Sequence, residues 1–357
     1  MFLRTIGFSV VFIGILEGIA EAVAGLSKSY FGQQSDRSGK RLPFVQWGYA
    51  LSAISKPMMA VFVYPLWIFL ARTMDRFGKG IRTGARDALL SDEATPATKG
   101  RVFGFHRSMD TFGAVLGPAL ALLYLYYHPG NYKTLFLITF APGVMVILLT
   151  LFIKEKKHTV STKPKINPLR FIYWKTSPPQ YRRLVSGLLL FAIFNSADVF
   201  LLLRMKESGL NDTRVIGVYI LYNIVFALTA YPVGILADKL GLKKIFILGL
   251  FIFAVVYAGF ALNNNIVVFI ALFILYGIYQ AATDGISKAW ISNIVDKGET
   301  ATAIGTFTGL QSICALIASS GCGLLWYNFG SMVTFLVTAG VTVIVIVYLS
   351  LSRSLTA

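Results

Sequence analysis

The sequence predicts an all-α protein that crosses a membrane many times, and three observations carry that prediction. The chain of 357 residues is 56% hydrophobic with a mean hydropathy of +0.68, above the roughly 45–50% apolar content of soluble domains. Its apolar residues occur in runs of about twenty, the length that a helix needs to cross about 30 Å of hydrocarbon. The runs are solidly apolar, whereas the strands of a membrane β-barrel alternate apolar and polar residues.

Eleven apolar runs are long enough to be membrane spans, five before a polar connection and six after it. Short loops that hold most of the basic residues separate these runs. The predicted spans are 8–30, 44–63, 64–88, 102–127 and 132–153 in the first part of the chain, and 183–205, 212–236, 244–262, 265–290, 300–324 and 330–351 in the second.

The longest connection, 154–182, predicts a linker between two domains. Together with Arg183 it holds nine basic residues and one acidic residue, and it contains four prolines. An excess of Lys and Arg beside membrane helices marks the cytoplasmic side, so this loop and the C-terminus are expected there. The net charge of +17 therefore indicates orientation rather than nucleic-acid binding. The predicted domains are an N-terminal bundle, 1–153, and a C-terminal bundle, 183–357.

A short polar motif occurs twice. The stretch "FGQQSDRSGKRLPF" at 31–44 returns as "VGILADKLGLKKIF" at 233–246. Glycines at such positions allow two helices to approach closely, and an acid at a helix end can pair with a basic residue or cap a neighbouring helix. Two copies indicate two similar halves, a plan common among secondary transporters. The repeated positions are Gly32, Asp36, Gly39 and Arg41 in the first copy and Gly234, Asp238, Gly241 and Lys244 in the second.

These residues resemble the signature of the major facilitator superfamily, G-x3-D-R-x-G-R/K-R/K. "GQQSDRSGKR" matches it from Gly32 and Asp36 through Arg37, Gly39, Lys40 and Arg41, and "GILADKLGLKK" resembles a degenerate second copy. "LARTMDRFGKG" is similar to the fourth-helix motif of the family, with Arg72 as its basic residue. "GAVLGPALA" is similar to a fifth-helix motif of antiporter members, at Gly113, Gly117 and Pro118. The resemblance implies twelve helices in two pseudo-symmetric bundles, so one further helix is expected before the eleven visible spans.

The span 64–88 carries an unusual density of charge for a membrane helix. Its ionisable residues recur every three or four positions, which places them on one stripe. A basic stripe that faces a cavity would favour an anionic substrate, although the same side chains could instead reach the headgroups or pair with acids. The stripe consists of Arg72, Asp75, Arg76, Lys79, Arg82 and Arg86. Lys56, before Pro57, is a further deep cation that we expect to be paired.

Two sets of residues in the first half are candidates for proton coupling. Glu17 and Glu21 lie one turn apart in the first span, and two carboxylates that close in a low dielectric do not both ionise. His106 and Asp110 are four residues apart, share a helix face and flank Arg107. In each case a purely structural pairing is the alternative.

The second half has fewer ionisable residues in its spans. Asn195 and Asp198 interrupt the apolar run of 183–205, and we expect Asp198 to line a cavity. Asp284 and Lys288 are four residues apart and are expected to form a structural bridge. Four tyrosines form either a pocket lining or interfacial anchors: Tyr219, Tyr222, Tyr276 and Tyr279.

The sequence thus predicts a secondary active transporter of a small organic solute that works by alternating access. Proton coupling is expected, and export is favoured by the fifth-helix motif. The alternatives are uptake of an anionic metabolite, and a truncated, non-transporting sensor or partner. No nucleotide loop, metal-ligand spacing or catalytic set is recognisable, which argues against an enzyme and against a cofactor. The expected partners are the lipid bilayer, the solute and a proton or other coupling ion, with the chain as a monomer in a bacterial inner membrane.

Overall fold

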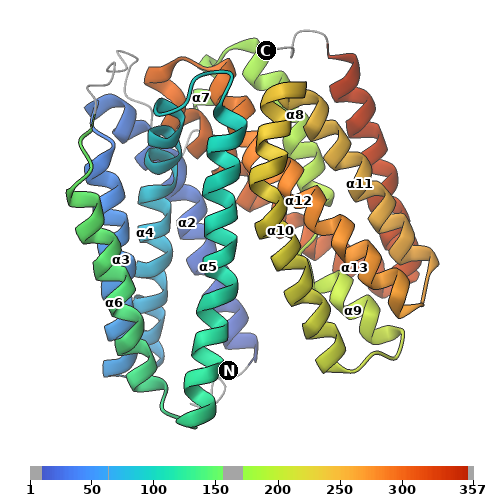
Figure 1. Ribbon diagram of the computed structural model, residues 1–357, viewed down its shortest axis with the longest axis horizontal. Helices are drawn as coiled ribbons and strands as arrows, with labels where there is room; N and C mark the ends of the chain where they lie inside the picture. The colour runs from blue at the N-terminus through green and yellow to red at the C-terminus, as the bar shows by residue number, and fades with distance from the viewer. Residues whose placement is uncertain (1–9, 63, 156–171, 353–357) are drawn as a thin grey trace. The chain divides into compact units, whose positions relative to one another are not determined.

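The protein is helical in every part that the structure describes, which confirms the predicted all-α class. The computed structural model describes residues 10–62, 64–155 and 172–352, except for the side chains of 10–22, 172, 212 and 213. These ranges contain long helices and no strand. Figure 1 shows the helices as extended rods.

The first five long helices correspond to the five spans predicted before the linker. They are α2 (Val10–Ser38), α3 (Leu42–Val61), α4 (Pro65–Asp92), α5 (Lys99–Tyr127) and α6 (Tyr132–Leu151). Local chemistry sets their ends. Gly39 has a φ of +62°, a value that glycine adopts without strain, and it follows the last residue of α2. Asn131 caps α6 by accepting a hydrogen bond from the Thr134 amide at 3.2 Å.

The second half contains the six remaining spans with one interruption that the apolar pattern does not predict. Its helices are α7 (Ile172–Thr176), α8 (Pro179–Phe194), α9 (Val199–Glu207), α10 (Asp212–Leu240), α11 (Leu242–Leu262), α12 (Ile266–Ile294), the 3₁₀ helix η2 (Lys297–Glu299) and α13 (Thr300–Leu351). A change of direction at Gly330, with a φ of +79°, divides α13 into the two predicted spans.

The prediction of one continuous helix over 183–205 is wrong. The chain leaves the helix after Phe194 and re-enters it at Val199. The physical reason is the polar composition of the intervening sequence, because Asn, Ser and Asp side chains compete for backbone groups and favour helix ends over helix interiors.

Seven helical segments of the described chain are long and apolar enough to cross a membrane. They are 99–127, 132–151, 179–207, 214–240, 242–262, 266–294 and 297–351, and the last contains two predicted spans. α4 is not among them because ionisable residues recur along most of its length.

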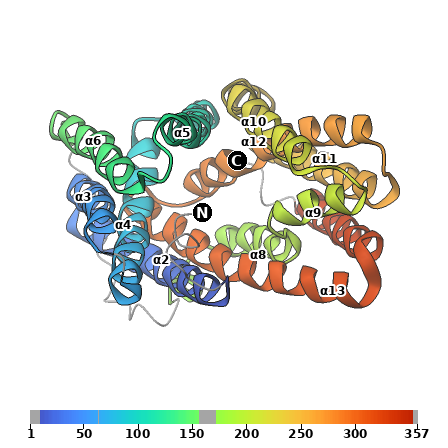
Figure 2. The ribbon, with the colours of Figure 1, turned by 90° about the horizontal axis from the view of Figure 1, so that it is seen from below.

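The helices form two compact units that do not coincide with the halves of the sequence. The first unit comprises Met1–Leu89, Pro118–Thr176 and Val295–Ser312, and the second comprises Leu90–Gly117, Ser177–Ile294 and Ile313–Ala357. In the first unit α3 packs against α6; in the second, α12 packs against both α10 and α11, as Figure 2 shows from the helix ends. Each unit therefore contains helices from both halves of the chain. The division into bundles 1–153 and 183–357 stays a prediction.

Candidate transport machinery

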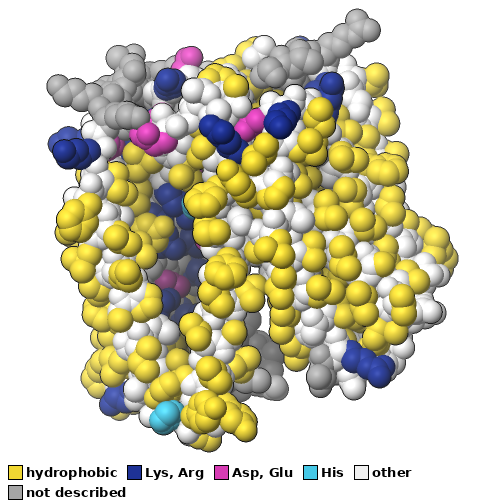
Figure 3. All heavy atoms as spheres, in the orientation of Figure 1, with side chains coloured by type: hydrophobic (Ala, Val, Ile, Leu, Met, Phe, Trp, Pro, Cys, Tyr) yellow, Lys and Arg dark blue, Asp and Glu magenta, His cyan; other side chains and the backbone are white. Residues whose placement is uncertain are grey.

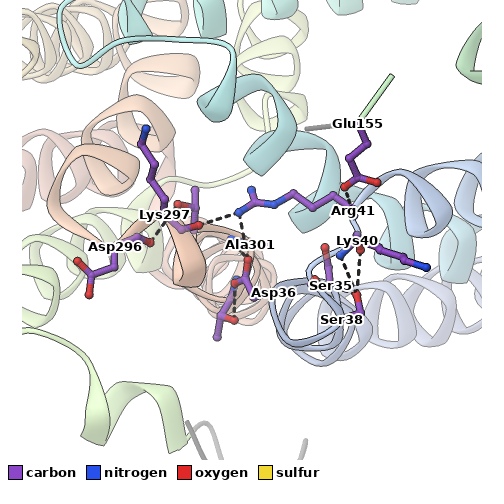
Figure 4. Close-up of polar contacts among 11 residues, drawn as sticks. Ser35, Asp36, Ser38, Lys40, Arg41, Glu155, Asp296, Lys297 and Ala301 are labelled. Carbon is purple, nitrogen blue, oxygen red and sulfur yellow. Dashed lines mark hydrogen bonds and ion pairs between the residues drawn. The ribbon is translucent and has the colours of Figure 1, made fainter. Parts of the chain in front are cut away.

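Asp36 joins the end of α2 to the start of α13. Its Oδ2 accepts hydrogen bonds from the amide and the hydroxyl of Thr302, both at 2.7 Å, and its Oδ1 accepts from the Ala301 amide at 3.3 Å. Ala301 and Thr302 are the second and third residues of α13, so Asp36 binds the free amides and the positive dipole end of that helix. Figure 4 shows these contacts, and only 2% of Asp36 is exposed.

Arg41 completes this site from the start of α3. Its guanidinium lies 3.4 Å from Asp36 Oδ1 and donates to the Lys297 carbonyl at 2.7 Å, with 1% of the residue exposed. Glu155 in turn accepts from the backbone amides of Arg41 and Leu42, the latter at 3.1 Å, and so caps α3 (Figure 4). We call the set Gly32, Asp36, Arg41, Ala301 and Thr302 the Asp36 contact.

Glycine allows the helices of the Asp36 contact to approach closely. A Cβ added at Gly32 would come within 3.0 Å of the Ala301 carbonyl oxygen, and one at Gly84 of α4 would also meet that oxygen, at 2.9 Å. The pattern continues along α2, where Gly305 of α13 lies against the Lys28 backbone. Lys28 itself donates to Ser312 at 2.9 Å. The first part of α13, from Thr300 to Ser312, is thus packed tightly against α2 and α4 of the same unit.

The second copy of the motif makes the equivalent contact in the other unit. Asp238 Oδ1 accepts from the Gly100 amide at 2.7 Å and Oδ2 from the Arg101 amide at 2.8 Å. Gly100 and Arg101 are the second and third residues of α5, as Ala301 and Thr302 are of α13. Gly234 lies against the Gly100 carbonyl, where a Cβ would come within 3.0 Å. We call Gly234, Asp238, Gly100 and Arg101 the Asp238 contact.

The remaining residues of the two motif copies differ in role. Gly241, with a φ of +100°, separates α10 from α11, just as Gly39 follows α2. Lys244 is exposed, whereas Arg41 is buried. Lys40 is exposed and Arg37 is half-buried at the end of α2.

The α4 stripe is half-buried and partly neutralised. Lys56 pairs with Asp75 at 3.1 Å, which confirms that this deep lysine is paired. Arg82 donates to Ser52 at 2.6 Å and lies 4.6 Å from the centre of the Tyr49 ring. Arg86 pairs with the neighbouring, fully buried Asp87 at 3.0 Å. Arg72, Arg76 and Lys79 lie on the same helix with intermediate exposure. In Figure 3 basic and acidic side chains are visible behind apolar ones.

Arg107 is the centre of a charged group in the second unit. It pairs with Asp110 on the same helix at 2.9 Å and with Asp284 of α12, and it lies 5.8 Å from the Phe226 ring. Asp284 thus has a partner from another helix that the sequence did not suggest. His106 and Lys288 lie on the same two helices, α5 and α12. The pairings predicted for them stay predictions.

Asn195 and Asp198 flank the interruption between α8 and α9. Asp198 accepts a hydrogen bond from the Tyr276 hydroxyl at 2.7 Å, and the Asn195 amide lies 3.1 Å from the Tyr279 hydroxyl. Both tyrosines are 1% exposed. They surround this polar group instead of serving as interfacial anchors.

The glycines of the predicted fifth-helix motif mark no close helix approach in the described part of the chain. A Cβ at Gly113 or Gly117 would meet no atom within 4 Å in the described chain, and Pro118 lies inside α5. The side chains of Glu17 and Glu21 lie outside the described residues, although both positions are within α2.

Comparisons with known proteins show which family the chain belongs to. The family model of the Major Facilitator Superfamily matches residues 1–227 and 184–356, which together span the chain. The chain belongs to the Major Facilitator Superfamily. It is therefore an integral membrane protein of a family of transporters.

A relative and two solved structures are similar to the chain over most of its length. An uncharacterized MFS-type transporter of Methanocaldococcus jannaschii is 33% identical over 333 residues, which cover 91% of this chain and 82% of the relative. The human organic anion transporter MFSD10 has a TM-score of 0.75 at 16% identity, covering 98% of this chain and 87% of its own. The transporter FucP in the outward conformation has a TM-score of 0.76 at 11% identity, covering 98% and 92%. At these identities the structures show a common fold.

Several residues of these sites could not be recognised from the sequence. Ala301 and Gly100 act through backbone amides, and Glu155 caps a helix far away in the sequence, so their own residue types carry little signal. The small residues Gly100 and Ala301 at the starts of α5 and α13 are a hint, because a helix end that packs closely against another helix needs small side chains.

Proposed function

We propose that this superfamily member is a secondary active transporter of a small organic solute that works by alternating access. The observation that carries the proposal is the reciprocity of the Asp36 and Asp238 contacts. An acid of the first half caps a helix of the second half, and an acid of the second half caps a helix of the first. Both contacts lie near loops predicted to be cytoplasmic.

The chemistry of these contacts suits a reversible closure. Each is made of hydrogen bonds between a carboxylate and backbone amides, together with glycine-lined backbone packing. Water can replace such hydrogen bonds when the helices part, because exposed amides and carboxylates are well hydrated. Opening of the cytoplasmic side would separate both contacts, and closing would restore them.

A small organic anion is the substrate class that we favour. Between Arg72 and Arg86 the α4 stripe has five basic residues and one acidic residue, Asp75, which gives this membrane helix an excess of positive charge. Guanidinium groups bind carboxylates and phosphates well. The fold shared with a human organic anion transporter is consistent with this class and adds no more than that.

Proton coupling and export form the next part of the proposal. A proton would be carried by Glu17 and Glu21 or by the group of His106, Arg107 and Asp110. The motif at Gly113 and Gly117 favours export, whereas the basic stripe is equally compatible with uptake of an anionic metabolite.

Flux through proteoliposomes that contain the full chain tests the proposal. A panel of radiolabelled carboxylates and organic phosphates, with neutral sugars as a comparison, is offered under an imposed pH gradient. We expect saturable flux of an anionic solute that Asp36→Asn abolishes and that Lys244→Ala, at the exposed matching position, leaves intact. Outward flux against an inward proton gradient indicates antiport, and inward flux indicates symport. No flux of any solute, together with no effect of Asp36→Asn, would favour the non-transporting sensor or partner.

A further inference from the structure

The interruption between α8 and α9 is unusual for an apolar helix, and we infer that it binds a small monovalent metal cation of the sodium class. The chain is non-helical only from Asn195 to Asp198, between the end of α8 at Phe194 and the start of α9 at Val199. An interrupted membrane helix exposes backbone oxygens that a continuous helix would use internally. Ala197 is exposed, so the interruption is accessible.

Two backbone carbonyls at the end of α8 lose their helical donors. In a continuous helix the Ala192 and Ile193 carbonyls would accept from the amides of Ser196 and Ala197. Here the Ser196 amide donates to the Phe194 carbonyl at 3.1 Å, and the Ala197 amide donates to Ser319 Oγ at 3.3 Å. The C-terminal end of a helix also carries the negative end of its dipole. Both features favour a cation.

Three side-chain oxygens lie at the same place. Asn195 Oδ1 has no hydrogen-bond partner in the described part of the chain. The Ser196 and Tyr257 hydroxyls lie beside each other and are deeply buried, with 3% and 0% of these residues exposed, and Tyr257 also lies beside Asp198. A hydroxyl that shares one hydrogen bond with a neighbour still has a lone pair for a ligand, so all three oxygens can bind a cation.

Asp198 supplies the negative charge. The ion pairs formed by the described residues include none with Asp198, whose carboxylate accepts from the Tyr276 hydroxyl. The nearest basic residue along the chain, Arg204, is engaged with the Phe260 carbonyl at 3.1 Å and with Asn264 at 2.7 Å. An isolated carboxylate among apolar helices is costly unless a cation accompanies it.

The chemistry of the lining selects a hard metal ion over other cations. The polar side chains that we propose as ligands, Asn195, Ser196, Asp198 and Tyr257, offer oxygen, the ligand type of hard cations. Cys322 beside Ser196 is a single thiol, and the described chain contains no cluster of three His, Cys, Asp or Glu residues of the kind that binds transition metals. An organic ammonium would need free aromatic faces. The neighbouring rings cover one another instead, with centroids of Tyr276 and Tyr279 5.2 Å apart and those of Phe253 and Tyr257 4.1 Å apart.

Sodium bound here would serve as a second coupling ion beside the proposed proton, a use that rests on the proposed function. Binding itself can be measured without transport. The full chain, purified in detergent micelles, is titrated with NaCl at constant ionic strength maintained with choline chloride, and thermal unfolding is followed by intrinsic fluorescence. A ligand that binds the folded state raises the Tm in a saturable manner, and the concentration dependence gives the apparent Kd.

The variants follow from the proposed ligands. We expect Asp198→Asn to abolish the sodium-dependent rise in Tm. Ser196→Ala and Tyr257→Phe should each raise the apparent Kd about tenfold, and they keep the test decisive where Asp198→Asn fails to fold. Glu207→Gln is the matched control, since Glu207 is an acid of α9 bonded to Trp326 and Ser331 away from the interruption, and it should retain the full rise.

Three results would overturn the inference. The first is a rise in Tm with choline chloride alone that equals the rise with NaCl, and the second is a full sodium-dependent rise in a folded Asp198→Asn variant. The third is a rise in Tm on acidification without sodium, after which sodium has no further effect, because this result indicates a proton site. Solute flux without sodium binding would overturn this inference and leave the proposed function standing. Sodium binding without any solute flux would support this inference and count against the proposed function.

Discussion

The Asp36 and Asp238 contacts are built from the same two features, a glycine and an aspartate, yet they differ in the basic residue that accompanies the aspartate. In both, a glycine brings the helices together and an aspartate binds the second and third amides of a helix. Asp36 is in addition paired with the buried Arg41, whereas the corresponding Lys244 is exposed. Glu155 also caps α3, whereas the residue before α11 is Gly241, which has no side chain to act as a cap. The glycine and aspartate are thus the common mechanism, and the cation is an addition to the first copy.

Loss of the buried pair is the largest expected effect and the sharpest test of this asymmetry. Asp36→Asn or Arg41→Ala leaves the other charge buried without its partner, which costs about 3–5 kcal/mol. Asp238→Asn removes a half-buried carboxylate bound to two amides, at about 1–2 kcal/mol. Lys244→Ala, at an exposed site, should change stability by less than about 0.5 kcal/mol. Thermal unfolding of the four purified variants checks the order. Equal losses for Arg41→Ala and Lys244→Ala would refute the asymmetry.

The glycines should behave alike in the two contacts. Gly32→Ala and Gly234→Ala each push a methyl group against a backbone carbonyl that cannot move aside, and overpacking of this kind costs about 1–3 kcal/mol. Gly113→Ala is the matched control, because its added methyl group meets no atom within 4 Å in the described chain. It should be neutral or slightly stabilising, since alanine favours a helix over glycine by about 1 kcal/mol. The measurement is again the Tm of each variant, and a loss in Gly113→Ala equal to that in Gly32→Ala would contradict the close-approach argument.

A smaller loss of stability than at the glycines is expected at the Glu155 cap of α3. Glu155→Gln weakens the acceptor for the amides of Arg41 and Leu42 and removes a negative charge from the start of α3. Lost caps and helix-dipole interactions at partly exposed sites cost about 0.5–1 kcal/mol. Lys154→Gln, one residue earlier, should have no effect on Tm. A loss in Lys154→Gln as large as that in Glu155→Gln would indicate a general effect of linker charge instead.

The sequence by itself determined the helical class, the positions of the spans and the existence of two related motifs. Apolar length and loop charge are local properties, and the glycine and aspartate of each motif are the residue types that a close, capped helix contact requires. Lys56 could be expected to have a partner because an unpaired deep charge is too costly. The same reasoning could not identify Asp75 as that partner, since Asp75 is 19 residues away on another helix and the sequence does not show which helix faces Lys56.

The tertiary structure decided which distant segments meet. Ala301 and Gly100 bind Asp36 and Asp238 through backbone amides, which every residue but proline carries, so no residue pattern marks them as partners. Thr302 adds its hydroxyl to its amide, but threonine is too common to be recognised for this role from the sequence. The partners of Asp198 and Asn195 were likewise set by the fold, because the hydroxyl groups of Tyr276 and Tyr279 reach them from α12. Helix formation in a membrane follows from local composition, whereas the pairing of polar groups depends on which helices the fold brings together.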